Sequence, residues 1–144
     1  MAENAQLTAI ILAINNLVQM VENMVGAGAG ADDVGNVKWK DSARAVATTN
    51  ITLEDEQTID TIAVVADDIV LAAGQTDPAE NGLYVVVDEG PWVRASNADT
   101  WIKLYAAMVV IEEGDTNADA VFLCAANTRT GVLGTTALPW IQIG

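Results

Sequence analysis

Residues 75–99 read Gln75-Thr-Asp-Pro-Ala-Glu-Asn-Gly-Leu-Tyr-Val-Val-Val87 and then Asp88-Glu-Gly-Pro-Trp-Val-Arg-Ala-Ser-Asn-Ala-Asp99, and they are the strongest indication of the fold. Asp77-Pro78 and Asn81-Gly82 are turn dipeptides, because proline fixes φ and Asn-Gly tolerates positive φ. The β-branched run that follows predicts a strand over 83–87. Asp88-Glu89-Gly90 predicts a three-residue connection into a second strand over 92–95, so we expect a β-hairpin here.

Short apolar runs between turn signals continue on both sides of this hairpin. Runs at spacings of about ten residues predict a mainly β fold, an antiparallel β-sandwich or a barrel-like domain. The first run alternates apolar and basic residues, as an exposed edge strand does. The expected strands cover residues 37–40, 43–47, 51–53, 62–65, 69–72, 83–87, 92–95, 105–111, 121–125 and 138–143.

Several motifs stand in a fixed order between residues 43 and 143, and together they are more specific than any one alone. They are Ala47-Thr-Thr-Asn-Ile-Thr-Leu53, Gln57-Thr-Ile-Asp60, Gln75-Thr-Asp-Pro-Ala-Glu-Asn-Gly-Leu-Tyr84, Trp92-Val-Arg-Ala95, Val110-Ile-Glu-Glu-Gly114 and Leu133-Gly-Thr-Thr-Ala-Leu-Pro-Trp140. In this order they resemble a β module of bacteriophage virion proteins, especially tail-fibre and fibre-adaptor proteins.

The sequence departs from the module that it resembles at two turns. Thr61 stands where a glycine commonly follows the Thr-Ile-Asp run, and Ala66-Asp67-Asp68 stands where Gly-Asp is usual. Both departures are expected to leave the fold in place. The resemblance implies a structural role in a virion, with head or tail placement open, and it implies trimers, because related phage fibres are commonly trimeric.

The segment Gly26-Ala-Gly-Ala-Gly-Ala31 divides the chain, with a helix pattern before it and strand patterns after it. We therefore expect an oligomerisation and anchoring helix over residues 1–25, a Gly/Ala-rich hinge over 26–36 and the antiparallel β-domain over 37–144. A Gly/Ala hinge is compatible with either fold-back or self-association of the helix.

The helix has a complete coiled-coil pattern over three heptads when Leu7 is placed at position a. Positions a and d are all apolar, and position e is apolar as well, which favours three or more strands over two. An apolar stripe of this kind is not stable when exposed, so it either folds back on the β-domain, self-associates as a parallel bundle or docks on another virion protein. The residues of the stripe are Leu7, Ile10, Ile11, Ile14, Leu17, Val18, Val21, Met24 and Val25.

Composition excludes several classes of function. The 144 residues include 6 basic and 20 acidic side chains, a formal charge of −14 that repels phosphate and disfavours nucleic acid as a partner. The N-terminus lacks the positive region of an export signal, and polar residues such as Asn15, Asn16 and Glu22 within the apolar run predict no membrane insertion. We expect a protein made in the bacterial host cytoplasm and localised in the virion.

The sequence also argues against catalysis. It has no histidine, the commonest general base and metal ligand, and Ser42 and Ser96 have no evident base partner. The single cysteine, Cys124, lies in an apolar strand and is expected to be buried and inert. The segment Asp115-Thr-Asn-Ala-Asp119 imitates the opening of a calcium loop but lacks its glycine and its bidentate glutamate, so we expect a solvated turn. No enzyme activity, metal or cofactor is predicted.

The four tryptophans allow one alternative function. Trp92 and Trp140 lie in apolar strand contexts and are expected in the core. Trp101 follows a polar loop and is expected to be partly exposed, so Asn97, Asp99 and Trp101 are candidate contacts for a host surface glycan. The favoured interpretation is a non-enzymatic virion structural protein (short fibre, fibre adaptor or capsid-surface decoration), and the alternative is a receptor-binding protein.

Overall fold

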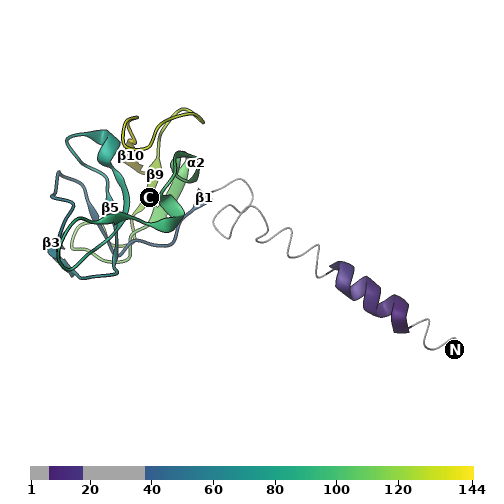
Figure 1. Cartoon of the computed structure of the whole chain (residues 1–144). Helices are drawn as coiled ribbons and strands as arrows, with labels where there is room; N and C mark the ends of the chain where they lie inside the picture. The colour runs from purple at the N-terminus through teal and green to yellow at the C-terminus, as the bar shows by residue number, and fades with distance from the viewer. Residues whose placement is uncertain (1–6, 18–37) are drawn as a thin grey trace. The chain divides into compact units, whose positions relative to one another are not determined.

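The computed structural model describes residues 7–17 and 38–144 (Figure 1). The chain divides into two compact units, residues 1–36 and 37–144. In the first unit, residues 7–17 form an α-helix, drawn in purple in Figure 1. No helix in the described part of the chain is long and apolar enough to cross a membrane.

The second unit is mainly β, with mixed sheets. Its strands are β1 (Lys38–Trp39), β2 (Ala45–Ala47), β3 (Gln57–Ile59), β4 (Ile62–Val64), β5 (Ile69–Ala72), β6 (Gly82–Val85), β7 (Val93–Arg94), β8 (Ala107–Val110), β9 (Val121–Cys124) and β10 (Trp140–Gln142). Between them lie two 3₁₀ helices, η1 (Pro78–Glu80) and η2 (Ser96–Ala98), and one short α-helix, α2 (Trp101–Leu104).

The strands form two four-stranded sheets of the same topology and one hairpin. The β1 sheet has the order β1-β8-β9-β10, the β2 sheet has the order β2-β5-β6-β7, and β3 pairs with β4. In each larger sheet the first pair is parallel and the next two are antiparallel.

The expected purely antiparallel domain is therefore wrong, because β1 pairs with β8 and β2 with β5 in parallel. Parallel pairing needs a long crossover. The segment between β2 and β5 provides one, since it contains the whole β3–β4 hairpin. The barrel-like alternative is also wrong, because the described strands form separate sheets that do not close.

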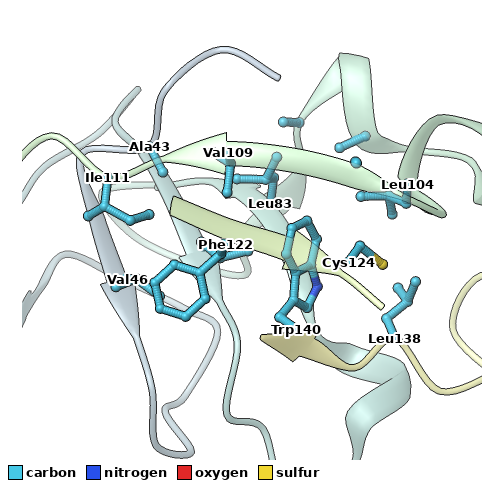
Figure 2. Packing of buried hydrophobic residues seen from close by; sticks show 14 of the residues in the cluster. Ala43, Val46, Leu83, Leu104, Val109, Ile111, Phe122, Cys124, Leu138 and Trp140 are labelled. Carbon is cyan, nitrogen blue, oxygen red and sulfur yellow. The ribbon is translucent and has the colours of Figure 1, made fainter. Parts of the chain in front are cut away.

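The two larger sheets pack on a shared hydrophobic core (Figure 2). The β2 sheet contributes Val46, Leu71 and Leu83, and the β1 sheet contributes residues such as Val109 and Phe122. A second core lies on the other face of the β2 sheet, where Ile59 and Val64 of the hairpin pack with strand residues that include Val70 and Tyr84. The β2 sheet is thus the middle of three layers.

The stretch at residues 75–94 forms the predicted hairpin of β6 and β7, with Tyr84 opposite Arg94. Asp77 caps η1 by accepting a hydrogen bond from the Ala79 N–H at 3.0 Å. The buried Asn81 side chain accepts from the Gln75 N–H at 2.9 Å and donates to the Leu138 carbonyl at 3.1 Å. The turn residues of this stretch therefore also connect it to the C-terminal segment.

The connection between β6 and β7 is longer than the expected three residues, since the ladder ends at Val85 opposite Val93. The backbone N–H of Val86 donates to Asp68 O at 2.9 Å, and that of Trp92 donates to Leu53 O at 2.9 Å. Because these groups bond to other segments, the hairpin opens early and both side chains enter the second core.

The expected strand over 51–53 does not form, because the Gln75 side-chain amide bonds to both backbone groups of Ile51, at 3.0 and 2.9 Å. Strand β3 was not predicted from the sequence. It forms because Asp60 and Thr61 take positive φ, 48° and 72°, and join it to β4 through a tight turn.

Candidate functional site

The apolar stripe of the N-terminal helix is exposed wherever the structure describes it. The exposed fractions are 57% for Leu7, 55% for Ile10, 51% for Ile11, 54% for Ile14 and 56% for Leu17. The remaining predicted members, Val18, Val21, Met24 and Val25, lie outside the described residues. Leu12 is 59% exposed as well, although it lies at heptad position f, outside the stripe.

The candidate glycan site does not have the expected form. Trp101 is only 7% exposed, so the expectation of a partly exposed ring is wrong. Trp101 and Leu104 are one helical turn apart in α2 and both enter the core, whereas Ile102 faces solvent and is 61% exposed. The Trp101 indole N–H donates to the Thr128 carbonyl at 3.1 Å. The ring is therefore a structural anchor for the segment that follows β9.

Of the other two residues of that candidate site, Asp99 is exposed and Asn97 is half-buried. Asp99 forms an ion pair with Lys103 at 2.8 Å, and this hydrogen bond holds the pKa of Asp99 below its usual value. Lys103 also donates to the Ser96 carbonyl at 2.8 Å. Asn97 is half-buried and lines a cavity of about 130 Å³ next to Ser96 and Asp41. The polar groups of this loop thus mainly stabilise the loop.

A polar cavity of about 210 Å³ lies where two of the ordered sequence motifs meet. Asp60, in the β3–β4 turn, accepts hydrogen bonds from the backbone N–H of Thr116 at 3.0 Å and from that of Asn117 at 2.9 Å. The Asn117 side-chain amide donates to the same carboxylate at 3.3 Å. Thr48 and Thr58 are among the other lining residues.

Opposing effects act on the Asp60 carboxyl group. Desolvation alone would raise its pKa, but the hydrogen bonds from Asn117 and Thr116 outweigh it and hold the pKa below the ordinary value of 3.8. A Cβ atom at Gly114 would collide with this carboxylate, so the glycine is required for the loop to approach the turn. The carboxylate is thus occupied as a structural acceptor.

The segment 115–119 forms a turn between β8 and β9 and connects to Asp60, since the Asp115 N–H also donates to the Asp60 carbonyl at 3.1 Å. Among the residues that the structure describes, no group of three or more acidic, cysteine or histidine side chains could hold a metal ion. Cys124 is 1% exposed, as expected, and burial raises the pKa of its thiol. A buried thiol with a raised pKa is a poor nucleophile.

The solvent-facing side of the β1 sheet is apolar from one edge to the other. Trp39 on β1 is paired with Met108 on β8, Met108 with Leu123 on β9, and Leu123 with Ile141 on β10. Next to this row, Val110 is paired with Val121, and the N–H of Ile143 donates to the Val121 carbonyl at 2.8 Å. We call the seven residues Trp39, Met108, Val110, Val121, Leu123, Ile141 and Ile143 the outer β1 face.

The outer β1 face was not predicted from the sequence, although alternation within each strand indicated which residues share a side. The residues between its members, such as Val109 and Phe122, are buried in the core. Of its members, Trp39 is 44% exposed, Ile141 47% and Ile143 51%. The face became visible only when the strand pairing was known.

No family model, curated protein or solved structure matches this chain.

Proposed function

We propose that this chain is a non-enzymatic structural protein of a bacteriophage virion, a short fibre, fibre adaptor or capsid-surface decoration, that self-associates through its N-terminal helix. The observation that carries the proposal is the exposed stripe over residues 7–17, where each of the five described a, d and e side chains is more than half exposed. An isolated helix with such a stripe is marginal in water, and association with other copies removes the stripe from solvent. Apolar e positions favour a parallel trimer.

The ordered motifs of the β-domain support assignment to a virion. Their resemblance to phage fibre modules covers residues 43–143. The structure brings the Asp60 motif against the turn that follows the Glu112-Glu113-Gly114 motif, and the Gln75–Tyr84 motif against Leu138. These motifs thus act as internal connectors of one domain. Polar residues that serve as internal hydrogen-bond partners suit a scaffold more than a catalyst.

Oligomeric state tests the role of the helix. The double substitution Ile14→Asp and Leu17→Asp places charges at positions a and d, each costing several kcal/mol when buried. Light scattering should show a trimer of the 15.1 kDa chain for the wild-type protein and a monomer for this variant. The control, Leu12→Asp with Asn16→Asp, adds the same charge at positions f and c and should remain trimeric. A monomeric wild-type protein would refute the helix-mediated assembly.

Location in the particle tests the virion assignment. Three chains of −14 give −42, so most of the acidic surface stays hydrated while the apolar stems require protein contact. We expect labelled virions to show the N-terminal helix nearest the particle body and the β-domain distal to it. Absence of the protein from purified virions would contradict the assignment, and the opposite orientation would contradict anchoring by the helix.

A further inference from the structure

The outer β1 face has a composition that a solvent-facing sheet does not normally have. A sheet with one face in water alternates apolar residues toward the core with polar residues toward solvent. In the β1 sheet the inner set includes Ala107, Val109 and Phe122 and is apolar except for Lys38 and Gln142, and all seven members of the outer β1 face are apolar. A continuous apolar patch across four strands indicates a contact surface.

The β2 sheet is also apolar on both sides, and both of its faces are covered. One of its faces packs on the β1 sheet, and its other face is covered by the β3–β4 hairpin, through residues such as Ile59 and Val64. The two sheets have the same topology. In the β-domain described here, one sheet therefore has a cover on each side and the other has a cover on one side only.

Charge indicates what covers the second side. The chain has 20 acidic and 6 basic side chains, so two copies repel one another at most surfaces. The outer β1 face has no charged member, which makes it a place where copies can meet without bringing carboxylates together. A basic partner would instead be attracted to the acidic parts of the surface, and this face has no acidic member.

We propose that the outer β1 face is a second contact between copies of this chain, covered by the β-domain of a neighbouring copy. The proposal deepens the self-association proposed above and rests on it. Once the helices hold the copies together, contact between β-domains occurs within one assembly and needs little affinity of its own. The first strand of the β-domain, β1, carries Trp39 and is an edge of this face.

A charge substitution on this face tests the proposal in the full-length protein. The double variant Val110→Glu and Ile141→Glu changes two residues that are 36% and 47% exposed, so the domain should remain folded. The variant loses the free energy that burial of an isoleucine contributes to the contact. The protein concentration at which its oligomer dissociates should therefore be at least about tenfold higher than for the wild-type protein. The control is Val65→Glu with Val93→Glu, which adds the same charge at residues that are 45% and 61% exposed and lie outside the face. Its dissociation concentration should match that of the wild-type protein.

Covalent footprinting distinguishes the possible covers. Protection of the peptides that contain Met108 and Ile141 should appear with association and disappear on dilution to monomer. An oligomer in which these peptides label as strongly as the Val93 peptide overturns this proposal and leaves helix-mediated assembly intact. Protection that persists in the monomer means that the chain's own N-terminal segment is the cover, which also overturns it. If the Ile14→Asp, Leu17→Asp variant still associates and still protects the Met108 and Ile141 peptides, the contact through the outer β1 face is supported. The same result would refute the helix as the main contact between copies.

Discussion

Asp60 and Thr61 show how strongly single residues determine the turns of this β-domain. Thr61 has φ 72° and Asp67 has φ 74°; a β-branched residue such as threonine rarely adopts this region, whereas aspartate adopts it more readily. Thr61 and the segment Ala66-Asp67-Asp68 are the two turns where the sequence was expected to depart from the phage module. The departures are compatible with the turns, and their expected effect is backbone strain.

We expect Thr61→Gly to stabilise the protein. Relief of an unfavourable φ is worth about 1–3 kcal/mol, and the extra entropy of glycine in the unfolded chain offsets part of it, which leaves about 0.5–1 kcal/mol. Thermal unfolding should show a rise of a few degrees in melting temperature. The control is Thr58→Gly, at an exposed position in β3, which should lower the melting temperature. Equal or opposite shifts would show that the turn is unstrained.

The lowered pKa of the Asp60 carboxyl group leads us to expect that the free energy of unfolding falls in acid. Its pKa is below 3.8 in the folded protein, so the unfolded chain takes up a proton at higher pH than the folded chain does. The stabilisation is complete above the unfolded pKa and is lost as pH falls through the folded pKa. Asp60→Asn should lower the free energy of unfolding at pH 7 and reduce its decline below about pH 4. Urea unfolding of this variant and of Asp88→Asn, an exposed loop carboxylate, separates the effect from net charge.

Two tryptophans with nearly equal burial are expected to contribute differently to the free energy of unfolding. Trp92 and Trp140 are 6% and 8% exposed, but only for Trp92 does the structure show a hydrogen bond, from its indole N–H to the Asp55 carbonyl at 2.8 Å. Replacement by phenylalanine removes similar apolar area from both. Trp92→Phe should therefore cost about 1 kcal/mol more than Trp140→Phe, measured by urea unfolding. Equal costs would mean that the Asp55 contact contributes nothing.

Individual elements were predicted well where one segment determines them alone. The helix at 7–17 and strands β5, β6, β8 and β9 lie where the periodicity placed them. The predictions failed where a distant segment intervened, through a side chain or through its backbone. Gln75 occupies the backbone of Ile51, and the bonds of Val86 and Trp92 to other segments lengthen the β6–β7 connection. Helix α2, Trp101–Leu104, is too short for a period to be recognised.

At the scale of the whole molecule, residues 37–144 should fold without the rest of the chain. Among the residues that the structure describes, both hydrophobic clusters consist of residues from this range. Expressed alone, this segment should give a β-rich far-ultraviolet circular dichroism spectrum and one cooperative unfolding transition. This segment retains the outer β1 face but lacks the helix that is proposed to hold the copies together. We therefore expect it to be less soluble than the full-length protein, and Val110→Glu with Ile141→Glu should restore its solubility. A disordered product would show that the N-terminal helix is part of the core.

The sequence by itself determined the local features: an apolar stripe before a Gly/Ala segment, turn dipeptides, apolar strands, a buried Cys124 and a strongly acidic surface. These follow from periodicity and residue chemistry within a few positions. Only the tertiary structure decided the parallel pairing of β1 with β8, the layer formed by the hairpin, the burial of Trp101 and the outer β1 face. Each of these depends on contacts between residues far apart in the chain. The free energy of such contacts comes from pairing and packing partners that no local pattern specifies.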